Sequence, residues 1–271
     1  MNKDTDIKKL INLHKNDPLQ LLSAIDGFYE TVKDESGNRF TPLVGYAGKY
    51  DAGDGKELQY VGEVYANFAE AEYPPLVLWH FALQLWLKIL NHFGGQEFLT
   101  KLVFVGPQMG GVCLAQMTAF HAGLVDARYA CAEKKITAVA SKNLREQSEM
   151  FFGRHKIHPG DKVIITEDVL NNFSTTKEVM ELVHLNGGEV IAIAGLLNRS
   201  MITSDTYYFH KHEKLMLEIP IISLVNKPFD QYRQDDPYVI KDMKKGNVVL
   251  KPKAEWSTLR DAISKANMLE S

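Results

Sequence analysis

The feature that most constrains the fold is a unit in the second half of the chain that combines a buried strand, two acids and a helix. Residues 160–188 read GDKVIITEDVLNNFSTTKEVMELVHLNGG. The apolar run Val163–Ile165 predicts a buried strand, and it leads to two neighbouring acids, Glu167 and Asp168. After a short polar loop, the amphipathic pattern of Thr175–Leu185 predicts a helix that stops at a glycine pair. A strand and a helix are therefore joined by a segment that carries two carboxylates.

The same alternation of strand and helix recurs along the chain. Further apolar runs predict strands at Leu102–Val105, Ala127–Cys131, Val190–Leu197 and Ile219–Val225. Strands that alternate with helices form parallel sheets whose two faces are covered by the helices. The sequence therefore predicts an α/β fold with a central, mostly parallel sheet flanked by helices.

The two ends of the chain follow other patterns. Before residue 72, the stretches PLVGYAGKY and LQYVGEVYANFAEAE predict a small antiparallel subregion around the turn DAGDG. Ala254–Met268 predicts a terminal helix. We expect residues 1–40 to form an N-terminal helical extension, residues 41–226 the main domain, and residues 227–271 a C-terminal helical extension packed on that same domain.

Composition limits the classes of partner and the compartment. The chain of 271 residues is 45% apolar and 24% charged, which is typical of a globular protein with a substantial core. A formal net charge of −3 does not favour nucleic acid or an anionic membrane as a partner. Two cysteines do not make a disulfide framework, and the first residues are charged without the apolar core of a signal peptide. We therefore expect a cytoplasmic protein.

The most apolar segment of the chain is Pro74–Gly95. His80, Gln84 and Lys88 interrupt it, and it falls short of the ~20 clean apolar residues that a membrane span requires. Its two prolines suit the start of a helix and its two glycines suit the end. The segment predicts a mostly buried helix, with a subunit interface as the second interpretation.

Two predicted loops lie where an open parallel sheet binds its ligands, beyond the carboxyl ends of the strands. The first is Gly106–Gly111, whose three glycines let the backbone approach an anion closely. In the second, Glu167 and Asp168 can accept hydrogen bonds from sugar hydroxyls or bind Mg²⁺, directly or through water. The loop after them stands at a helix N-terminus, which favours a phosphate. Hydroxyls, a metal and a phosphate together predict a phosphorylated ribose as ligand.

These stretches resemble the type I phosphoribosyltransferase family. VIITEDVLNNFSTT is similar to the family's signature for phosphoribosyl pyrophosphate, and VFVGPQMGGVCLA is similar to its pyrophosphate loop. PGDKVIITEDV and GGEVIAIAGLLNRS resemble the orotate phosphoribosyltransferases in particular, and the resemblance covers roughly residues 45–225. It implies the type I phosphoribosyltransferase fold for the main domain, Mg²⁺ as cofactor, and a homodimer. It also implies a reaction that joins a pyrimidine-like base, with orotate the first choice, to phosphoribosyl pyrophosphate as pyrophosphate leaves.

The resemblance assigns roles to individual residues. Glu167 and Asp168 would hold the ribose hydroxyls and Mg²⁺, and Asp168 is also counted among the catalytic residues. Arg199 would bind the base, because an arginine suits a carboxylate such as that of orotate bidentately. The remaining candidates for substrate binding, in the two loops, are Gly106, Gly110, Gly111, Asn171, Asn172, Ser174, Thr175 and Thr176.

The phosphate loop departs from the family pattern. Phe173 stands where the family has glycine, and a bulky side chain is unfavourable at a positive φ and fills space. One hypothesis is a working site in which Phe173 turns away, Ser174 or Thr175 caps the helix, and the amides of residues 174–176 bind phosphate. The other is that the ring fills the phosphate space and the site has lost its usual ligand.

The catalytic loop departs as well. In the family, a run of arginine, lysines and a histidine on a mobile loop closes over the neighbouring subunit's site. Lys134 and Lys135 match the start of that run and are the loop's candidate catalytic residues, but the histidine is missing at the expected distance. Lys142, Arg145 and Arg154 are further cations of the same region. For any single lysine here, a solvated charged loop is the simpler interpretation.

Two alternatives from other functional classes stay open. The chain could be a non-catalytic protein that keeps this fold and senses a nucleotide or phosphoribosyl pyrophosphate, and Phe173 favours that interpretation. It could also be a phosphoribosyltransferase for another base, although Arg199 disfavours a neutral purine. The spacing of His210 and His212 suits a metal, but an exposed strand gives the same pattern.

Overall fold

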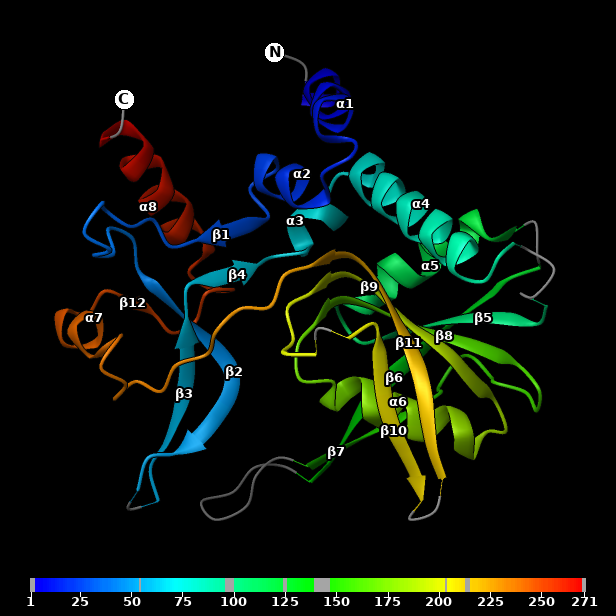
Figure 1. Ribbon diagram of the computed structural model, residues 1–271. Coiled ribbons are helices and arrows are strands. Elements are labelled where there is room, and N and C mark those ends of the chain that lie inside the picture. Colours follow the sequence, from blue (N-terminus) through cyan, green and yellow to red (C-terminus); the bar gives the residue numbers. More distant parts are fainter. Residues whose placement is uncertain are drawn as a thin grey trace. The chain divides into compact units, whose positions relative to one another are not determined.

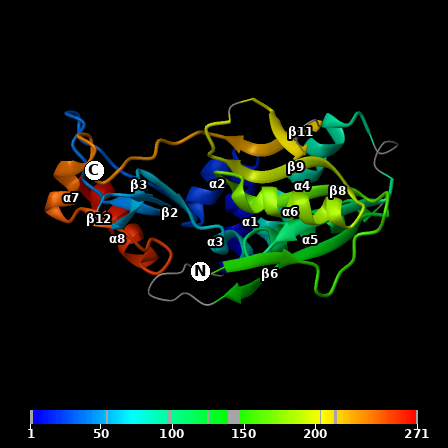
Figure 2. The ribbon, with the colours of Figure 1, turned by 90° about the horizontal axis from the view of Figure 1, so that it is seen from below.

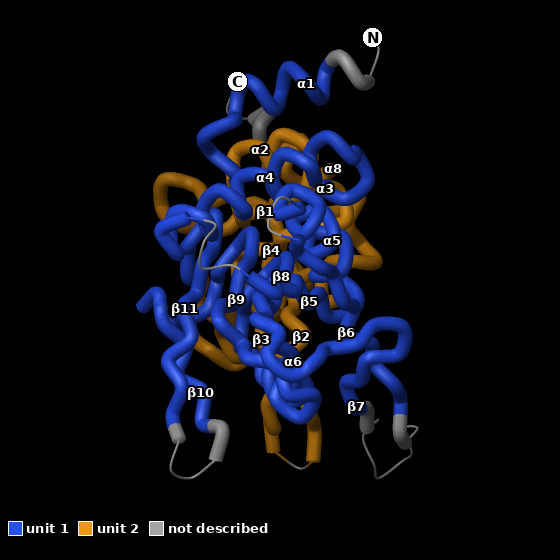
Figure 3. Tube along the Cα trace, turned by 90° about the vertical axis from the view of Figure 1, so that its right-hand side faces the viewer, with its two compact units in different colours: residues 1–18, 71–228 blue, residues 19–70, 229–271 orange. Residues whose placement is uncertain are grey.

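The computed structural model describes residues 3–53, 55–95, 100–123, 126–138, 147–202, 204–212 and 215–269, which divide into two compact units (Figure 3). Unit 1 contains residues 1–18 and 71–228, and unit 2 contains residues 19–70 and 229–271. This division differs from the predicted boundaries at residues 40 and 226. The C-terminal segment belongs with residues 19–70, because it supplies a strand and a helix to the core of unit 2.

Within the described residues, the main sheet of unit 1 has seven strands in the order β10-β11-β9-β8-β5-β6-β7. Strands β11, β9, β8 and β6 of this sheet are labelled in Figure 2. The strands are β5 Leu102–Pro107, β6 Arg128–Ala138, β7 Gln147–Phe151, β8 Lys162–Leu170, β9 Glu189–Asn198, β10 Thr206–His212 and β11 Leu215–Asn226. The pairs from β11 to β6 are parallel, and the two edge strands, β10 and β7, pair antiparallel. The predicted mostly parallel sheet is confirmed.

Helices cover both faces of this sheet (Figure 1). Helices α4 (Pro75–His92) and α5 (Gly111–His121) lie on one face, and α6 (Ser174–Leu185) lies on the other. Helix α1 (Lys3–His14) contacts α4. The single turn α3 (Ala69–Glu72) comes directly before α4 in the chain. In the described part of the chain, no helix is long and apolar enough to cross a membrane.

The core between the sheet and α6 follows from the sequence pattern. Central strands of a parallel sheet are buried on both faces, so they are made of continuous β-branched and apolar residues. Val163 and Ile165 of β8 pack there with Val179 and Val183 of α6. Burial of each such side chain contributes about 1.5–3 kcal/mol. This packing holds α6 on one face of the sheet, with its N-terminus just after the carboxyl end of β8.

Unit 2 contains the small antiparallel subregion that the sequence predicts. Strand β2 (Leu43–Asp51) pairs antiparallel with β3 (Glu57–Gly62) and parallel with β12 (Val248–Val249), while β1 (Phe28–Glu30) pairs antiparallel with β4 (Val64–Ala66). Its helices are α2 (Pro18–Ala24), α7 (Ile240–Lys245) and α8 (Trp256–Leu269), and α8 confirms the predicted terminal helix. Trp256 and Leu259 of α8 pack with Tyr29 and Val44, which explains why the C-terminal segment joins this unit.

Candidate functional site

The two acids lie inside β8 and not in a loop after it. Pairing of β8 with β5 ends at Ile165, whereas pairing with β9 continues to Leu170. The segment from Thr166 onward is therefore paired with β9 on one side and turns its other side toward the loop that follows β5. Glu167 and Asp168 both belong to this segment, at the carboxyl end of the parallel strands.

The glycines of the 106–111 loop are required by close packing, both on β8 and within the loop itself. A Cβ atom at Gly110 would lie 2.5 Å from Asp168 Cγ, and one at Gly111 would lie 2.8 Å from Pro107 Cδ. At Gly106 a Cβ would lie 2.8 Å from the carbonyl carbon of Gly111. The loop thus folds tightly against the acidic segment, and the carboxylate of Asp168 rests on the backbone of Gly110.

The two carboxylates have different surroundings. Successive side chains of a strand point to opposite faces, so Asp168 faces the glycine loop and Glu167 faces the other way. Asp168 Oδ1 accepts a hydrogen bond from Val169 N at 2.7 Å. Burial, and then the neighbouring charge of Asp168, raise the pKa of Glu167 well above its usual value. Glu167 therefore keeps its proton to a higher pH than a solvated glutamate.

The carboxylates of Glu167 and Asp168 can hold Mg²⁺ only together with oxygen atoms of a bound ligand. Among the described residues, no group of three or more His, Cys, Asp or Glu side chains could hold a metal ion. Mg²⁺ is commonly bound by one or two carboxylates, with substrate phosphates and waters completing the coordination. Asp168, on the side of the glycine loop, suits that role.

Phe173 keeps the backbone conformation that normally favours glycine. Its φ is 58° and its ψ is 13°, in the left-handed region, where it stands just before the first residue of α6. Its side chain is 4% exposed and stacks on Tyr207 of β10, with the ring centroids 4.8 Å apart. The ring belongs to the hydrophobic core and does not fill the loop. This is the orientation that the working-site hypothesis requires.

The start of α6 is closed by Asn172. Its Oδ1 accepts hydrogen bonds from Ser174 N at 3.1 Å and from Ser174 Oγ at 2.9 Å. The predicted cap at Ser174 or Thr175 is wrong, because the helix already begins at Ser174. Asn172 and Ser174 are exposed, Asn171 and Thr175 are half-buried, and Thr176 is buried. The role of Asn172 could have been predicted from the sequence, because an Asn side chain commonly accepts a hydrogen bond from the backbone amide two residues further along.

Arg199 follows the last residue of β9 and lies beside the end of β8. Its backbone N donates to the Leu170 carbonyl oxygen at 2.9 Å, and the residue is 6% exposed. The preceding residue, Asn198, accepts hydrogen bonds at Oδ1 from Ser200 N at 3.1 Å and from Ser200 Oγ at 2.7 Å. The structure therefore brings Arg199 to the same edge of the sheet as the phosphate loop, which Leu170 directly precedes.

Lys134 and Lys135 lie in a strand, and their predicted place at the start of a loop is wrong. The strand predicted at 127–131 continues as β6 to Ala138 and pairs antiparallel with β7, with Lys134 opposite Met150 and Lys135 opposite Glu149. Both lysines are exposed. Lys142 and Arg145 lie outside the described residues, and Arg154 is exposed, with its N donating to Glu133 Oε1 at 3.3 Å.

Gln108 is a residue of this edge that the sequence analysis did not single out. Its N donates to the Ala132 carbonyl oxygen at 3.0 Å, and its Oε1 accepts from Lys134 N at 3.2 Å. The peptide bond between Gln108 and Met109 is cis. Gln108 thus ties the glycine loop to the β6 strand that carries the two lysines.

Curated relatives define the class of protein that the chain resembles. It is 37% identical over 97 residues to the orotate phosphoribosyltransferase of Carboxydothermus hydrogenoformans, which is 35% of this chain and 44% of the relative. It is 29% identical over 140 residues to the orotate phosphoribosyltransferase of Caldanaerobacter subterraneus. This match covers 52% of this chain and 61% of the relative. The matches thus span about half the length of these relatives. The chain is similar to type I phosphoribosyltransferases.

Within that class, the similarity is to the orotate phosphoribosyltransferases, as the sequence motifs predict. Among solved structures, the orotate phosphoribosyltransferase of Aeropyrum pernix has a TM-score of 0.44 at 15% identity, covering 77% of this chain and 92% of the other. An adenine phosphoribosyltransferase of Thermoanaerobacter pseudethanolicus has a TM-score of 0.43 at 16% identity, and the match covers 66% of this chain and 94% of the other. No model of a protein family matches the chain.

Proposed function

We propose that this protein joins a pyrimidine-like base, with orotate the first choice, to phosphoribosyl pyrophosphate and releases pyrophosphate. The observation that carries the proposal is the packing of the Asp168 carboxylate on Gly110 at the carboxyl end of the parallel strands. A sugar-binding acid and a loop that accepts a pyrophosphate must meet at one place for this reaction. The similarity to orotate phosphoribosyltransferases supports the same reaction.

Each part of the site has its own role in the proposed reaction. Asp168 accepts hydrogen bonds from ribose hydroxyls, and Glu167, whose pKa is raised by burial, can both donate and accept. The backbone amides of Thr175 and Thr176 at the start of α6 bind the 5′-phosphate, where the helix dipole favours an anion, and the amide of Ser174 is engaged by Asn172. The loop at Gly110 leaves room for pyrophosphate. A cation at Lys134 or Lys135 stabilises the negative charge that develops as the pyrophosphate leaves.

Displacement at ribose carbon 1 passes through a cationic centre and needs no nucleophilic side chain. The residues therefore act by holding the two substrates in line and by balancing charge. Mg²⁺, when bound at Asp168 and ligand oxygens, would neutralise part of the pyrophosphate charge. The cytoplasm is the location we propose, because both cysteines that the structure describes are free thiols.

Arg199 is the residue that selects the base in this proposal. A guanidinium is planar and matches a carboxylate with two parallel hydrogen bonds. The residue is buried beside the end of β8, where contact with water is small and an ionic hydrogen bond is strong. Orotate carries a carboxylate on its ring, whereas adenine and uracil do not, so Arg199 favours orotate.

We also propose that the protein is a homodimer formed through the outer face of α4. Leu76 and Trp79 of α4 are each 42% exposed, Leu87 is 54% exposed, and Phe120 of the neighbouring α5 is 73% exposed. Exposed apolar side chains gathered on adjacent helices are typical of a subunit interface, and homo-oligomers mostly have two-fold symmetry.

A specific observation favours the sensing alternative. Asn172 already engages the N and the Oγ of Ser174, and the side chain of Thr176 is buried, so three polar groups of the loop are engaged or turned inward. A loop with fewer available donors suits a protein that binds phosphoribosyl pyrophosphate without turning it over. This alternative keeps the ligand and removes the reaction.

One experiment separates these functions. The pure protein is mixed with phosphoribosyl pyrophosphate, Mg²⁺ and, in separate reactions, orotate, uracil, adenine or hypoxanthine, and pyrophosphate release is measured. The proposed function predicts release with orotate that exceeds release with each neutral base. Release with adenine and not with orotate would replace the base assignment. Binding of phosphoribosyl pyrophosphate without release for any base would favour the sensor.

A further inference from the structure

Unit 2 contains a cavity that the proposed reaction does not use. Its volume is about 550 Å³, within the ~300–1,000 Å³ that is usual for small-molecule sites. Two segments far apart in the chain line it: residues 37–40, between β1 and β2, and residues 237–247, around α7. All of these residues belong to unit 2 and are described.

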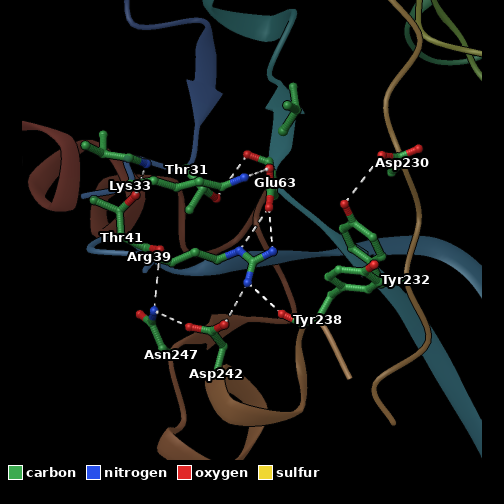
Figure 4. A network of polar contacts seen from close by, with 12 residues as sticks. Thr31, Lys33, Arg39, Thr41, Glu63, Asp230, Tyr232, Tyr238, Asp242 and Asn247 are labelled. Atoms are coloured by element: carbon green, nitrogen blue, oxygen red, sulfur yellow. Dashed lines mark hydrogen bonds and ion pairs between the residues drawn. The ribbon is translucent and has the colours of Figure 1, made fainter. Parts of the chain in front are cut away.

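Arg39 is one of the residues that line this cavity, and Figure 4 shows the polar contacts of its side chain. Its Nε donates to Glu63 Oε1 at 2.9 Å, and its Nη1 donates to Asp242 Oδ2 at 3.0 Å and to the Tyr238 carbonyl oxygen at 2.8 Å. A second bond joins Nη2 to Glu63 Oε1. The guanidinium charge is therefore balanced by two carboxylates, and each of its three nitrogens donates at least one hydrogen bond. Arg39 holds the two lining segments together and is not the group that would bind a ligand.

Two lysines supply positive charge to the cavity. Lys241 and Lys245 both line it and stand one helical turn apart on α7, so they lie on the same face of the helix. Lys241 Nζ donates to Asn38 Oδ1 at 3.2 Å, which directs it toward the 37–40 turn. Asp242 is the acid among the lining residues, and its two oxygens bond Arg39 and Asn247 Nδ2.

The neighbouring acid of the turn is also engaged. The carboxylate of Asp34 accepts hydrogen bonds from Asn38 N at 2.7 Å and from Asn38 Nδ2 at 3.0 Å. Both lysines are exposed, and the acids beside them are bonded to other partners. Lys241 also interacts electrostatically with Asp34. An anion in the cavity would thus meet the exposed ammonium group of Lys245 and would share that of Lys241 with Asn38 and Asp34.

Two exposed aromatic rings line the same cavity. Phe40 is 56% exposed and Tyr238 is 77% exposed, whereas large aromatic side chains are more often buried in a hydrophobic core. An aromatic ring that faces solvent beside cations is a surface on which a planar ligand can stack. The combination of two rings and two lysines indicates a ligand with both an aromatic part and an anionic part.

We propose that this cavity binds a nucleoside monophosphate. The phosphate lies between Lys241 and Lys245, and the base stacks on Phe40 or Tyr238. The site is built entirely from unit 2, so it is independent of the residues in unit 1 to which the phosphoribosyl transfer is assigned. Its occupation does not depend on whether that transfer takes place.

Calorimetry with adenosine 5′-monophosphate tests the site. The double variant Lys241→Ala/Lys245→Ala should bind the nucleotide at least about tenfold more weakly than the wild type. The matched control is Lys244→Ala, which removes a lysine from the same helix outside the cavity lining and should leave the affinity unchanged. Adenosine and inorganic phosphate, tested separately, should each bind at least about tenfold more weakly than the nucleotide.

The same comparison in proteins that also carry Asp168→Asn separates this site from the one proposed in unit 1. The wild type, the double variant and Lys244→Ala are also compared with Asp168→Asn added to each, and the loss caused by the double substitution should persist there. The proposal is overturned if the wild type does not bind the nucleotide, or if the double variant binds it as tightly. It is also overturned if Lys244→Ala loses as much affinity, since the effect would then come from net charge, or if the loss disappears with Asp168→Asn.

Discussion

Phe173 shows how one residue can break a sequence pattern and keep the backbone that the pattern encodes. Its φ of 58° lies in the left-handed region, which costs a non-glycine residue about 1–2 kcal/mol. Burial of the ring against Tyr207 offsets that cost, because a buried aromatic side chain contributes more than the strain removes. The position therefore keeps the turn and gains a hydrophobic anchor.

This account predicts the effect of Phe173→Gly. Truncation of a buried aromatic residue typically costs ~3–5 kcal/mol, and relief of the left-handed strain returns only part of it. Urea unfolding should therefore show a large loss of stability, while calorimetry shows nearly unchanged affinity for phosphoribosyl pyrophosphate.

Tyr207→Phe is the matched control, because it keeps the stacked ring and should stay within about 0.5 kcal/mol of the wild type. If Phe173→Gly instead leaves stability unchanged and creates or strengthens phosphoribosyl pyrophosphate binding, the ring fills the phosphate space and the working-site hypothesis is wrong.

At the scale of secondary-structure elements, the strongly periodic segments were predictable and the irregular ones were not. The helix predicted at Thr175–Leu185 is observed at Ser174–Leu185, because its amphipathic period is clear. The extension of β6 to Ala138 was missed, because an exposed edge hairpin has no buried face to impose alternation.

The same limit applies to the candidate site. The meeting of Asp168 with the glycine loop follows from the rule that parallel strands present their carboxyl ends at one edge. The contact of Gln108 with β6 depends on loop geometry that residue types do not encode. In unit 2, Arg39 and Asp242 are 203 positions apart, so their ion pair could not be read from local pattern.

That ion-pair network predicts a pH dependence for unit 2. Burial alone would raise the pKa of Glu63, but hydrogen bonds and charges from Lys33 and Arg39 outweigh it and lower the pKa below its usual value. A depressed folded-state pKa gives stability that is present above the unfolded value, about 4.3, and lost as the pH falls through the folded value. Unit 2 should therefore lose stability below about pH 4.3.

Urea unfolding between neutral and acidic pH measures this effect in the wild type and in Glu63→Gln. The variant should be less stable at neutral pH and less sensitive to acid, because it has no carboxylate to protonate at this position. Two unfolding curves that shift in parallel over the whole pH range would rule out Glu63 as the titrating group.

At the scale of the whole molecule, the chain is built from two compact units whose segments alternate along the sequence. Each unit carries one candidate binding site, with phosphoribosyl pyrophosphate assigned to unit 1 and a nucleoside monophosphate to unit 2. The apolar face of α4 adds a proposed contact with a second copy, because it combines exposed leucine and tryptophan side chains.

Trp79→Glu tests this subunit contact. A charge placed in an apolar interface is strongly unfavourable, so sedimentation at micromolar concentration should show a dimer for the wild type and a monomer for the variant. Leu185→Glu is the control, because Leu185 is 85% exposed at the end of α6 and lies outside the proposed interface. A wild-type monomer at these concentrations would contradict the dimer.

The most direct test of the central claim is the binding of phosphoribosyl pyrophosphate, with Mg²⁺, to the wild type and to Asp168→Asn. Because Asp168 packs on the glycine loop and is assigned the ribose hydroxyls and the metal, calorimetry should show that the variant binds at least about tenfold more weakly, with the fold intact by circular dichroism. Glu189→Gln, an equal change of charge at the exposed start of β9, should bind like the wild type. Equal affinity in Asp168→Asn and the wild type would contradict the assignment of the sugar site to this edge of the sheet.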